Sequence, residues 1–173
     1  MAKRFRGEGT SKLDDKGRLL LPASLRSVLQ GLDGRIPTDP RPVLVMVYGG
    51  EDQKNLEFYT EASMEELAAK IEALPEDDVK WAAEDKYFGQ TEEVEVDQNG
   101  RILLKARFRD KLGVSDEVYV IGRGTKFEIW KKEDFEADRA ARRDPSGPLS
   151  GAALLQAIDE RYRARMAQQG TGP

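Results

Sequence analysis

The side chains with the clearest chemical use in this sequence are arginines that recur in register. Arg18 and Arg26 are matched by Arg101 and Arg109, each 83 residues further along the chain (101 − 18 and 109 − 26). A guanidinium can hold guanine O6 and N7 through two parallel hydrogen bonds, whereas a lysine such as Lys16, or an arginine on a helix, suits phosphate oxygens. The set indicates a nucleic-acid-binding surface. The simpler alternative is a solvated strand edge, because exposed lysine and arginine are common.

These residues lie in a stretch that occurs twice. Leu13–Pro22 reads LDDKGRLLLP and Val96–Lys105 reads VDQNGRILLK. The turn residues match in register, with Asp14 equivalent to Asp97 and Gly17 equivalent to Gly100. A repeat of this kind must be recognised before any fold is assigned. The sequence therefore predicts two copies of one structural unit within a single chain.

Each copy has the composition of a tight turn that leads into a strand. An aspartate can accept a hydrogen bond from the backbone two residues further on, and a glycine can adopt the positive φ that such a turn requires. Arg18 and Arg101 would then begin returning strands just after exposed turns. A purely structural alternative is left open, in which each aspartate pairs with its own arginine and only pins the turn.

Other chemistries are poorly supported by the sequence. It contains no cysteine and no histidine, which excludes metal sites and catalytic triads built on those residues. Asp14 and Asp15 could form a catalytic carboxylate pair, but an exposed charged turn is the simpler interpretation. Asp97–Gly100 lacks the glutamate of a calcium loop, and Gly122–Lys126 lacks the spacing of a phosphate-binding loop. We expect no enzymatic activity, no cofactor and no metal.

The charge of the chain is unevenly distributed. Lysine and arginine number 28 against 32 acidic residues, for a net charge of −4, which is not typical of a basic DNA-binding protein. Residues 1–30 nevertheless carry seven basic and three acidic side chains, and residues 51–80 carry three basic and ten acidic ones. A basic end of this kind fits a negatively charged partner. The apolar runs are too short for a signal peptide or a membrane span.

The hydrophobic pattern predicts short strands and helices around the two turns. Strands are expected at 43–48, 56–59, 92–96, 101–104, 117–121 and 126–130, and short helices at 23–29 and 106–112. A longer helix should begin with Ser63 as its N-cap and Glu66 completing a capping box. Tyr59, Trp81 and Trp130 are expected in the core. A last helix at 152–168, with an apolar stripe of Leu154, Ile158, Tyr162 and Met166, follows a Pro/Gly/Ser linker.

The motifs together resemble the MraZ family, which belongs to the AbrB-like (SpoVT-AbrB) DNA-binding superfamily. The resemblance is carried by FRGEGT at Phe5–Thr10, by the two copies of the repeated stretch, and by FEIW at Phe127–Trp130. It extends from about Phe5 to about Phe135. Lys105 departs from the family pattern, because a proline would be typical there.

The resemblance implies an α+β fold with two AbrB-like swapped-hairpin units related by a pseudo-twofold axis and flanked by helices. The first unit, with a helical insertion, would occupy residues 1–86, and the second residues 87–143. Residues 144–173 would form a flexible linker and a C-terminal helix outside the resemblance.

The resemblance also implies a function. Members of the MraZ family are transcriptional repressors of the bacterial division and cell-wall gene cluster, and they bind tandem short repeats in their own promoters as ring-shaped homo-oligomers. A cytoplasmic, nucleoid-associated ring of eight or more subunits is therefore expected here. Basic residues at positions that match Arg18, Arg101, Arg26 and Arg109 contact double-stranded DNA in AbrB-like proteins.

Two other interpretations remain at this point. One is an AbrB-type antitoxin that contacts its toxin through Ala152–Gln168, although antitoxin units are usually single. The other is a ring-forming interaction protein that does not bind DNA and uses its acidic flank to contact a basic partner.

Overall fold

The computed structural model describes residues 3–143, 145–147 and 149–170. The chain divides into two compact units, Met1–Glu136 and Ala137–Pro173, which we call the body and the tail and describe separately. The predicted linker begins at residue 144, and that residue, residue 148 and residues 171–173 lie outside the described part of the chain. All the residues singled out as candidate DNA contacts lie in the body.

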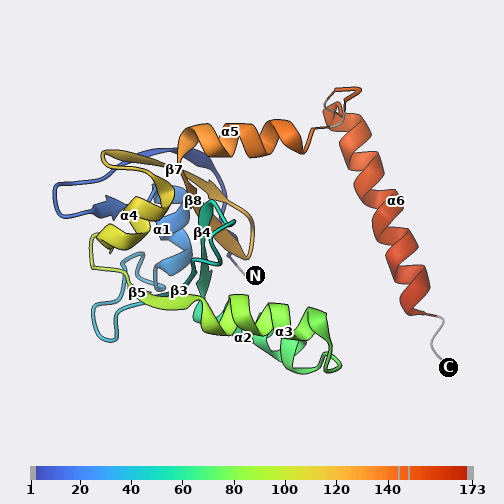
Figure 1. Cartoon of the computed structure of the whole chain (residues 1–173), viewed down its shortest axis with the longest axis horizontal. Coiled ribbons are helices and arrows are strands. Elements are labelled where there is room, and N and C mark those ends of the chain that lie inside the picture. The colour runs from blue at the N-terminus through green and yellow to red at the C-terminus, as the bar shows by residue number, and fades with distance from the viewer. Residues whose placement is uncertain (1–2, 144, 148, 171–173) are drawn as a thin grey trace. The chain divides into compact units, whose positions relative to one another are not determined.

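The body is built on a six-stranded antiparallel sheet and a separate two-stranded sheet (Figure 1). The larger sheet has the order β1-β7-β8-β4-β3-β5, and the smaller one pairs β2 with β6. The strands are β1 (Glu8–Lys12), β2 (Arg18–Leu20), β3 (Val43–Val47), β4 (Asn55–Thr60), β5 (Thr91–Glu95), β6 (Arg101–Leu103), β7 (Glu117–Gly122) and β8 (Lys126–Trp130).

The two repeats exchange strands throughout the body. β1 of the first repeat pairs with β7 of the second, while β5 of the second pairs with β3 of the first. β4 and β8 pair at the centre, with Phe58 opposite Phe127. Each strand thus has its equivalent across a pseudo-twofold axis that passes between β4 and β8. This arrangement confirms the expected α+β fold of duplicated, swapped-hairpin units.

One hydrophobic core joins both repeats. Leu19 of β2 and Ile102 of β6 are buried in it together with the inward side chains of the larger sheet. The Phe58 and Phe127 rings stack at its centre with centroids 4.8 Å apart. Fully burying a leucine or phenylalanine contributes roughly 1.5–3 kcal/mol, so a core shared in this way makes the stability of each repeat dependent on the other.

Two short helices cover this core and are equivalent in the two repeats. They are α1 (Ala23–Leu29) and α4 (Ala106–Leu112), and Figure 1 shows both beside the six-stranded sheet. Leu25 of α1 and Phe108 of α4 are buried in the common core. Helix α1 follows closely on β2, and α4 follows closely on β6. The position of each helix therefore determines where its arginine, Arg26 or Arg109, can lie.

The opposite face of the sheet carries a buried charged network. Glu57 of β4 lies directly across from Glu128 of β8, and both side chains are buried. Lys126 Nζ lies 3.0 Å from Glu57 Oε2 and 3.4 Å from Glu128 Oε1, and Lys86 Nζ lies 3.0 Å from Glu57 Oε1. Burial acts to raise the pKa of Glu57, but the two lysines outweigh it and hold that pKa below its usual value. The facing carboxylates are thus stabilised by shared cations.

The helical insertion differs in detail from the prediction. Helix α2 (Glu61–Glu72) begins earlier than expected, and Thr60 is its N-cap, because its Oγ1 accepts a hydrogen bond from the Ser63 backbone N–H at 3.1 Å. Ser63 therefore lies inside the helix, and the predicted capping box with Glu66 is wrong. The strand β4 runs straight into α2 without a loop, so the threonine at the junction is the residue placed to cap it.

The next segment also departs from the expected pattern. Helix α3 (Asp78–Glu84) is followed by a π-helical turn, η1 (Asp85–Gly89), before β5 begins. Trp81 was expected in the core but is 57% exposed, whereas Tyr59 and Trp130 are buried as predicted. Trp81 lies on a short helix that contributes no buried residue, and an aromatic side chain does not by itself establish burial.

Two further helices complete the chain. Helix α5 (Lys132–Ala141) begins in the body, where Phe135 packs on Tyr119 and Trp130 with ring centroids 4.6 and 5.7 Å apart. Helix α6 (Gly151–Gln169) belongs to the tail, and Ser150 caps it. The predicted stripe of α6 is present but exposed at each of its four positions. No helix in the described residues has the length and apolar character needed to span a membrane.

We expect a chain that ends at Arg143 to retain the cooperative unfolding of the body, because α6 buries none of its side chains. Thermal unfolding followed by circular dichroism checks this. The control is Phe135→Ala, which should lower the free energy of unfolding by about 3–5 kcal/mol, the usual cost of truncating a buried phenylalanine. Loss of the cooperative transition in the truncated chain would show instead that the stripe on α6 is part of the core.

Candidate nucleic-acid interface

The first turn, Asp14–Arg18, is closed by its own aspartate. Asp14 Oδ1 accepts hydrogen bonds from the backbone N–H groups of Lys16 and Arg18 at 3.0 and 2.8 Å. The Arg18 Nε–H donates to Asp14 Oδ2 at 2.7 Å. The bond from the Arg18 backbone is the main cause that holds the pKa of Asp14 below its usual value. Asp14 therefore remains ionised near neutral pH, and it orients the Arg18 guanidinium by holding Nε.

The second turn, Asp97–Arg101, has the same backbone but a different side-chain arrangement. Asp97 Oδ1 accepts from the backbone N–H groups of Asn99 and Arg101 at 2.8 and 2.9 Å. Arg101, unlike Arg18, makes no ion pair with any acidic residue in the described part of the chain. The structural alternative, in which each aspartate pairs with its own arginine, thus describes the first turn and not the second.

Each turn is held by the other repeat. The Leu21 backbone N–H donates to Gly100 O at 3.0 Å, and the Leu104 backbone N–H donates to Gly17 O at 2.9 Å. Both glycines have φ near +80°. A Cβ on Gly17 would lie 2.7 Å from Leu104 O, so only glycine fits at that crossing. The prediction that the turns need glycine is confirmed by the positive φ. At Gly17 the close approach between the repeats is a second reason.

The strands that follow the turns form one small surface. In the β2–β6 pair, Arg18 lies opposite Leu103 and Leu20 lies opposite Arg101. Because side chains alternate along a strand, these four share the outward face while Leu19 and Ile102 point into the core. Leu20 and Leu103 are 44% and 48% exposed. We call this outward face, formed by Arg18, Leu20, Arg101 and Leu103, the ribbon face.

Arg26 and Arg109 lie against the turns and are only partly accessible. Both are half-buried, and each donates to a carbonyl five residues before it, Arg26 Nη1 to Leu21 O at 3.0 Å and Arg109 Nε to Leu104 O at 3.1 Å. Each also packs against the glycine turn of the opposite repeat, since a Cβ on Gly100 would meet Arg26 Cδ and one on Gly17 would meet Arg109 Nε. The stem of Arg26 therefore covers the second turn and does not project freely into solvent.

Further charged side chains lie close to the ribbon face. Lys16 is exposed at the tip of the first turn. Lys105 and Arg107 both pair with Glu92, and the hydrogen bond from Lys105 is the main cause that lowers the pKa of Glu92. The positive charge that Lys105 adds in place of a proline is therefore paired with an acidic side chain within the body. No acidic cluster suited to a metal ion occurs among the described residues.

Sequence reasoning missed the two exposed leucines. Leu20 and Leu103 are the middle residues of apolar triplets, a pattern that by itself suggests burial. Their exposure follows from the pairing of β2 with β6, which turns alternate side chains of each triplet outward. The only hint of their exposed position in the sequence is that both copies of the repeat have a leucine there. This hint is weak, because a shared leucine is equally expected in a core.

Proteins similar to this chain share one family name. A family model described as "MraZ protein, putative antitoxin-like" matches residues 87–146. A protein of Ruegeria pomeroyi is 39% identical over 142 residues, 82% of this chain and 85% of the relative. One from Cereibacter sphaeroides is 34% identical over 168 residues, covering 92% and 98%, and one from Legionella pneumophila is 35% identical over 136 residues, covering 78% and 84%. Each of the three is named "Transcriptional regulator MraZ".

The fold and the paired turns define a protein of two intertwined AbrB-like repeats. The identity and coverage of the relatives then specify the family: the chain belongs to the MraZ family.

We expect Gly17→Ala to destabilise the body more than Gly124→Ala. Both positions have φ near +80°, a conformation that costs an alanine roughly 1–2 kcal/mol. A Cβ on Gly124 meets nothing within 4 Å, whereas one on Gly17 meets the Leu104 carbonyl, and such a contact adds about 1–3 kcal/mol. Urea unfolding of both variants measures the difference. Equal losses would mean that the crossing of the repeats is not tightly packed.

Proposed function

We propose that this chain is a sequence-specific DNA-binding transcriptional regulator that presents the ribbon face to the major groove. The observation that carries the proposal is the placement of Arg18 and Arg101 on one outward face of a two-stranded ribbon. A ribbon of this width fits the major groove, and arginine is the side chain best suited to guanine. The names of the relatives agree with a role in transcription.

The residues of the site can be given separate roles in this proposal. Arg18 and Arg101 would contact base edges, with Arg18 held in position by Asp14. Leu20 and Leu103 offer apolar contacts of the kind that read a thymine methyl group. Lys16 would bind a phosphate. Arg26 and Arg109 would also bind phosphates, through the guanidinium N–H groups that do not donate to Leu21 O or Leu104 O. Asp14, Asp97, Gly17 and Gly100 support the turns. The mechanism needs no catalytic step and no cofactor.

The wider assignment rests on the family. We infer that the chain represses the bacterial division and cell-wall gene cluster, including its own promoter, in the cytoplasm and at the nucleoid. Two guanine contacts at about 1–3 kcal/mol each fall well short of the roughly 12 kcal/mol of a nanomolar complex. A homo-oligomeric ring of eight or more subunits on tandem short repeats would supply the remainder through multiple linked contacts.

The Arg18→Ala/Arg101→Ala double variant should lose discrimination between its own upstream DNA and a scrambled sequence. Each guanine contact provides about 1–3 kcal/mol of base discrimination, which corresponds to a loss of at least tenfold for the pair. Band-shift titrations on both DNAs measure it. Melting temperature and oligomer mass should stay close to wild type, because Arg18 is exposed and its surface pair with Asp14 contributes little stability. Arg101 is half-buried but makes no ion pair in the described part of the chain. Full discrimination retained by the double variant would refute the placement of the reading surface.

The protein should also have a mass in solution of at least eight subunits. Multi-angle light scattering at micromolar concentration tests this. The chain truncated at Arg143 serves as a comparison, because it retains every candidate DNA contact and both edge strands. A monomeric mass would contradict the proposal, because a single subunit has only two guanine-binding arginines and the proposal requires linked contacts from several subunits.

A further inference from the structure

The two repeats differ in the segment that follows their short helices. Residues 30–42 link α1 to β3, whereas only residues 113–116 link α4 to β7. The longer segment, which we call the α1–β3 loop, therefore has no counterpart in the second repeat. It packs on the second turn: Ile36 is buried, and its Cδ1 would lie 3.2 Å from a Cβ on Gly100.

Internal hydrogen bonds shape this loop. The Gly31 backbone N–H donates to Arg35 O at 2.9 Å, and the Gly34 N–H donates to Gly31 O at 3.1 Å. Asp33 Oδ1 accepts from the Arg35 backbone N–H at 3.0 Å. Together with the buried Ile36, these bonds fix the backbone of Arg35 beside the second turn, while its side chain remains exposed.

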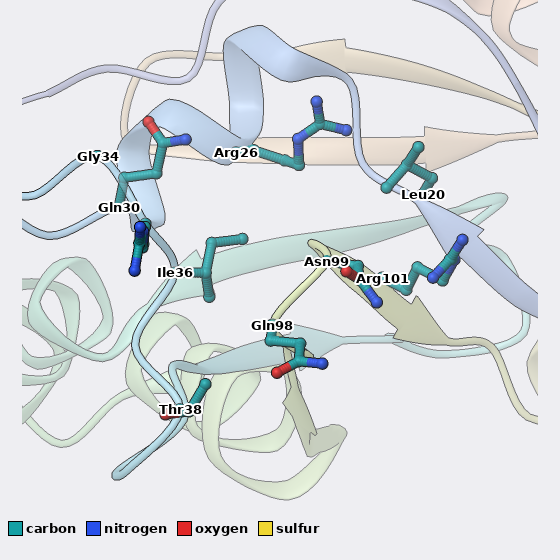
Figure 2. Close-up of a pocket in the computed structure, with 10 residues that line it drawn as sticks. Leu20, Arg26, Gln30, Gly34, Ile36, Thr38, Gln98, Asn99 and Arg101 are labelled. Carbon is teal, nitrogen blue, oxygen red and sulfur yellow. The ribbon is translucent and has the colours of Figure 1, made fainter.

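An open pocket rich in cations lies between the α1–β3 loop and the second turn (Figure 2). Arg26, Arg35 and Arg101 all line it, together with the side-chain amides of Gln30, Gln98 and Asn99, and none of its lining residues is acidic. Figure 2 shows Arg26 and Ile36 near the residues of the second turn, Gln98, Asn99 and Arg101. A pocket lined by three arginines and several side-chain amides, with no carboxylate, is suited to bind a phosphate group.

The pocket lies where the two turns differ in charge. The first turn carries Lys16, and the equivalent residue in the second turn is the neutral Asn99. Arg35 brings a cation to the same turn from the α1–β3 loop and makes no ion pair within the described residues. Each turn thereby has three basic side chains around it, namely Lys16, Arg18 and Arg109 at the first and Arg35, Arg101 and Arg26 at the second.

We propose that Arg35 binds a backbone phosphate of DNA beside the second turn and replaces the charge that Lys16 provides at the first. The proposal rests on the DNA-binding function proposed above and adds a contact from a loop outside the repeated motif. Arg26, held by the Leu21 carbonyl, forms the fixed wall of the site. Arg101 lines the same pocket as Arg35, so one bound nucleotide segment would engage both arginines.

The test compares Arg35→Ala, Arg35→Lys and Arg35→Ala/Asn99→Lys with wild type. Each is titrated with its own upstream DNA and with a scrambled sequence at several salt concentrations. Arg35→Ala should weaken binding by the same factor on both DNAs, and the log–log salt slope should become shallower by about 0.9 for each engaged subunit. Arg35→Lys should keep the slope, and Asn99→Lys should restore it by placing the cation on the turn. Arg163→Ala, an exposed arginine of the tail, is the matched control.

Several results would overturn the proposal. An unchanged affinity and salt slope for Arg35→Ala would show that no phosphate is bound, and a loss confined to the cognate sequence would show a base contact instead. A fall in melting temperature shared by Arg35→Ala and Arg35→Lys would show that the side chain stabilises the loop. No retention of DNA by wild type at low salt would instead refute the proposed function itself.

A phosphate group could also come from a small molecule, and a separate arm distinguishes this source. Inorganic pyrophosphate is added without DNA, and the melting temperatures of wild type and Arg35→Ala are compared. We expect no shift that depends on Arg35. A shift present only in wild type, with an unchanged DNA salt slope, would assign the pocket to a free phosphorylated ligand and overturn the DNA contact.

Discussion

The structure depends on two reciprocal hydrogen bonds, from Leu21 to Gly100 and from Leu104 to Gly17. They join the strand that leaves each turn to the turn of the other repeat. Because of them, β2 and β6 pair side by side, and Arg18 and Arg101 come to share one face. A Cβ on Gly17 would meet the Leu104 carbonyl oxygen, and one on Gly100 would meet the side chains of Arg26 and Ile36, so both crossings favour glycine. Neither arginine would be placed correctly by its own repeat alone.

The sequence predicted the parts that are encoded locally. The aspartate–glycine turns, most of the short strands and the two equivalent helices follow from composition and spacing, and the constant offset revealed the duplication. The offset could not show that the repeats exchange strands, since equivalent residues would match in separate domains as well. The exchange was expected from the family resemblance, and the structure confirms it.

Contacts between the repeats were beyond local prediction. Arg26 and Arg109 were predicted to contact DNA from their helices, but no local pattern indicates that each stem packs on a turn encoded more than 70 residues away. The outward position of Leu20 and Leu103 depends on pairing with the other repeat. Arg35 lies outside the repeated motif, so no comparison between the copies could select it. In each case the deciding contact is made across the pseudo-twofold axis.

The exchange of strands also constrains how the protein can be made. β1 reaches its partner β7 only after residues 117–122 have left the ribosome. At about 5–20 residues per second, the first repeat waits roughly 5–20 s with β1 and β2 unpaired. Pairings of such large sequence separation form slowly. The strand exchange that positions the two arginines therefore delays completion of both sheets until the second repeat has been synthesised.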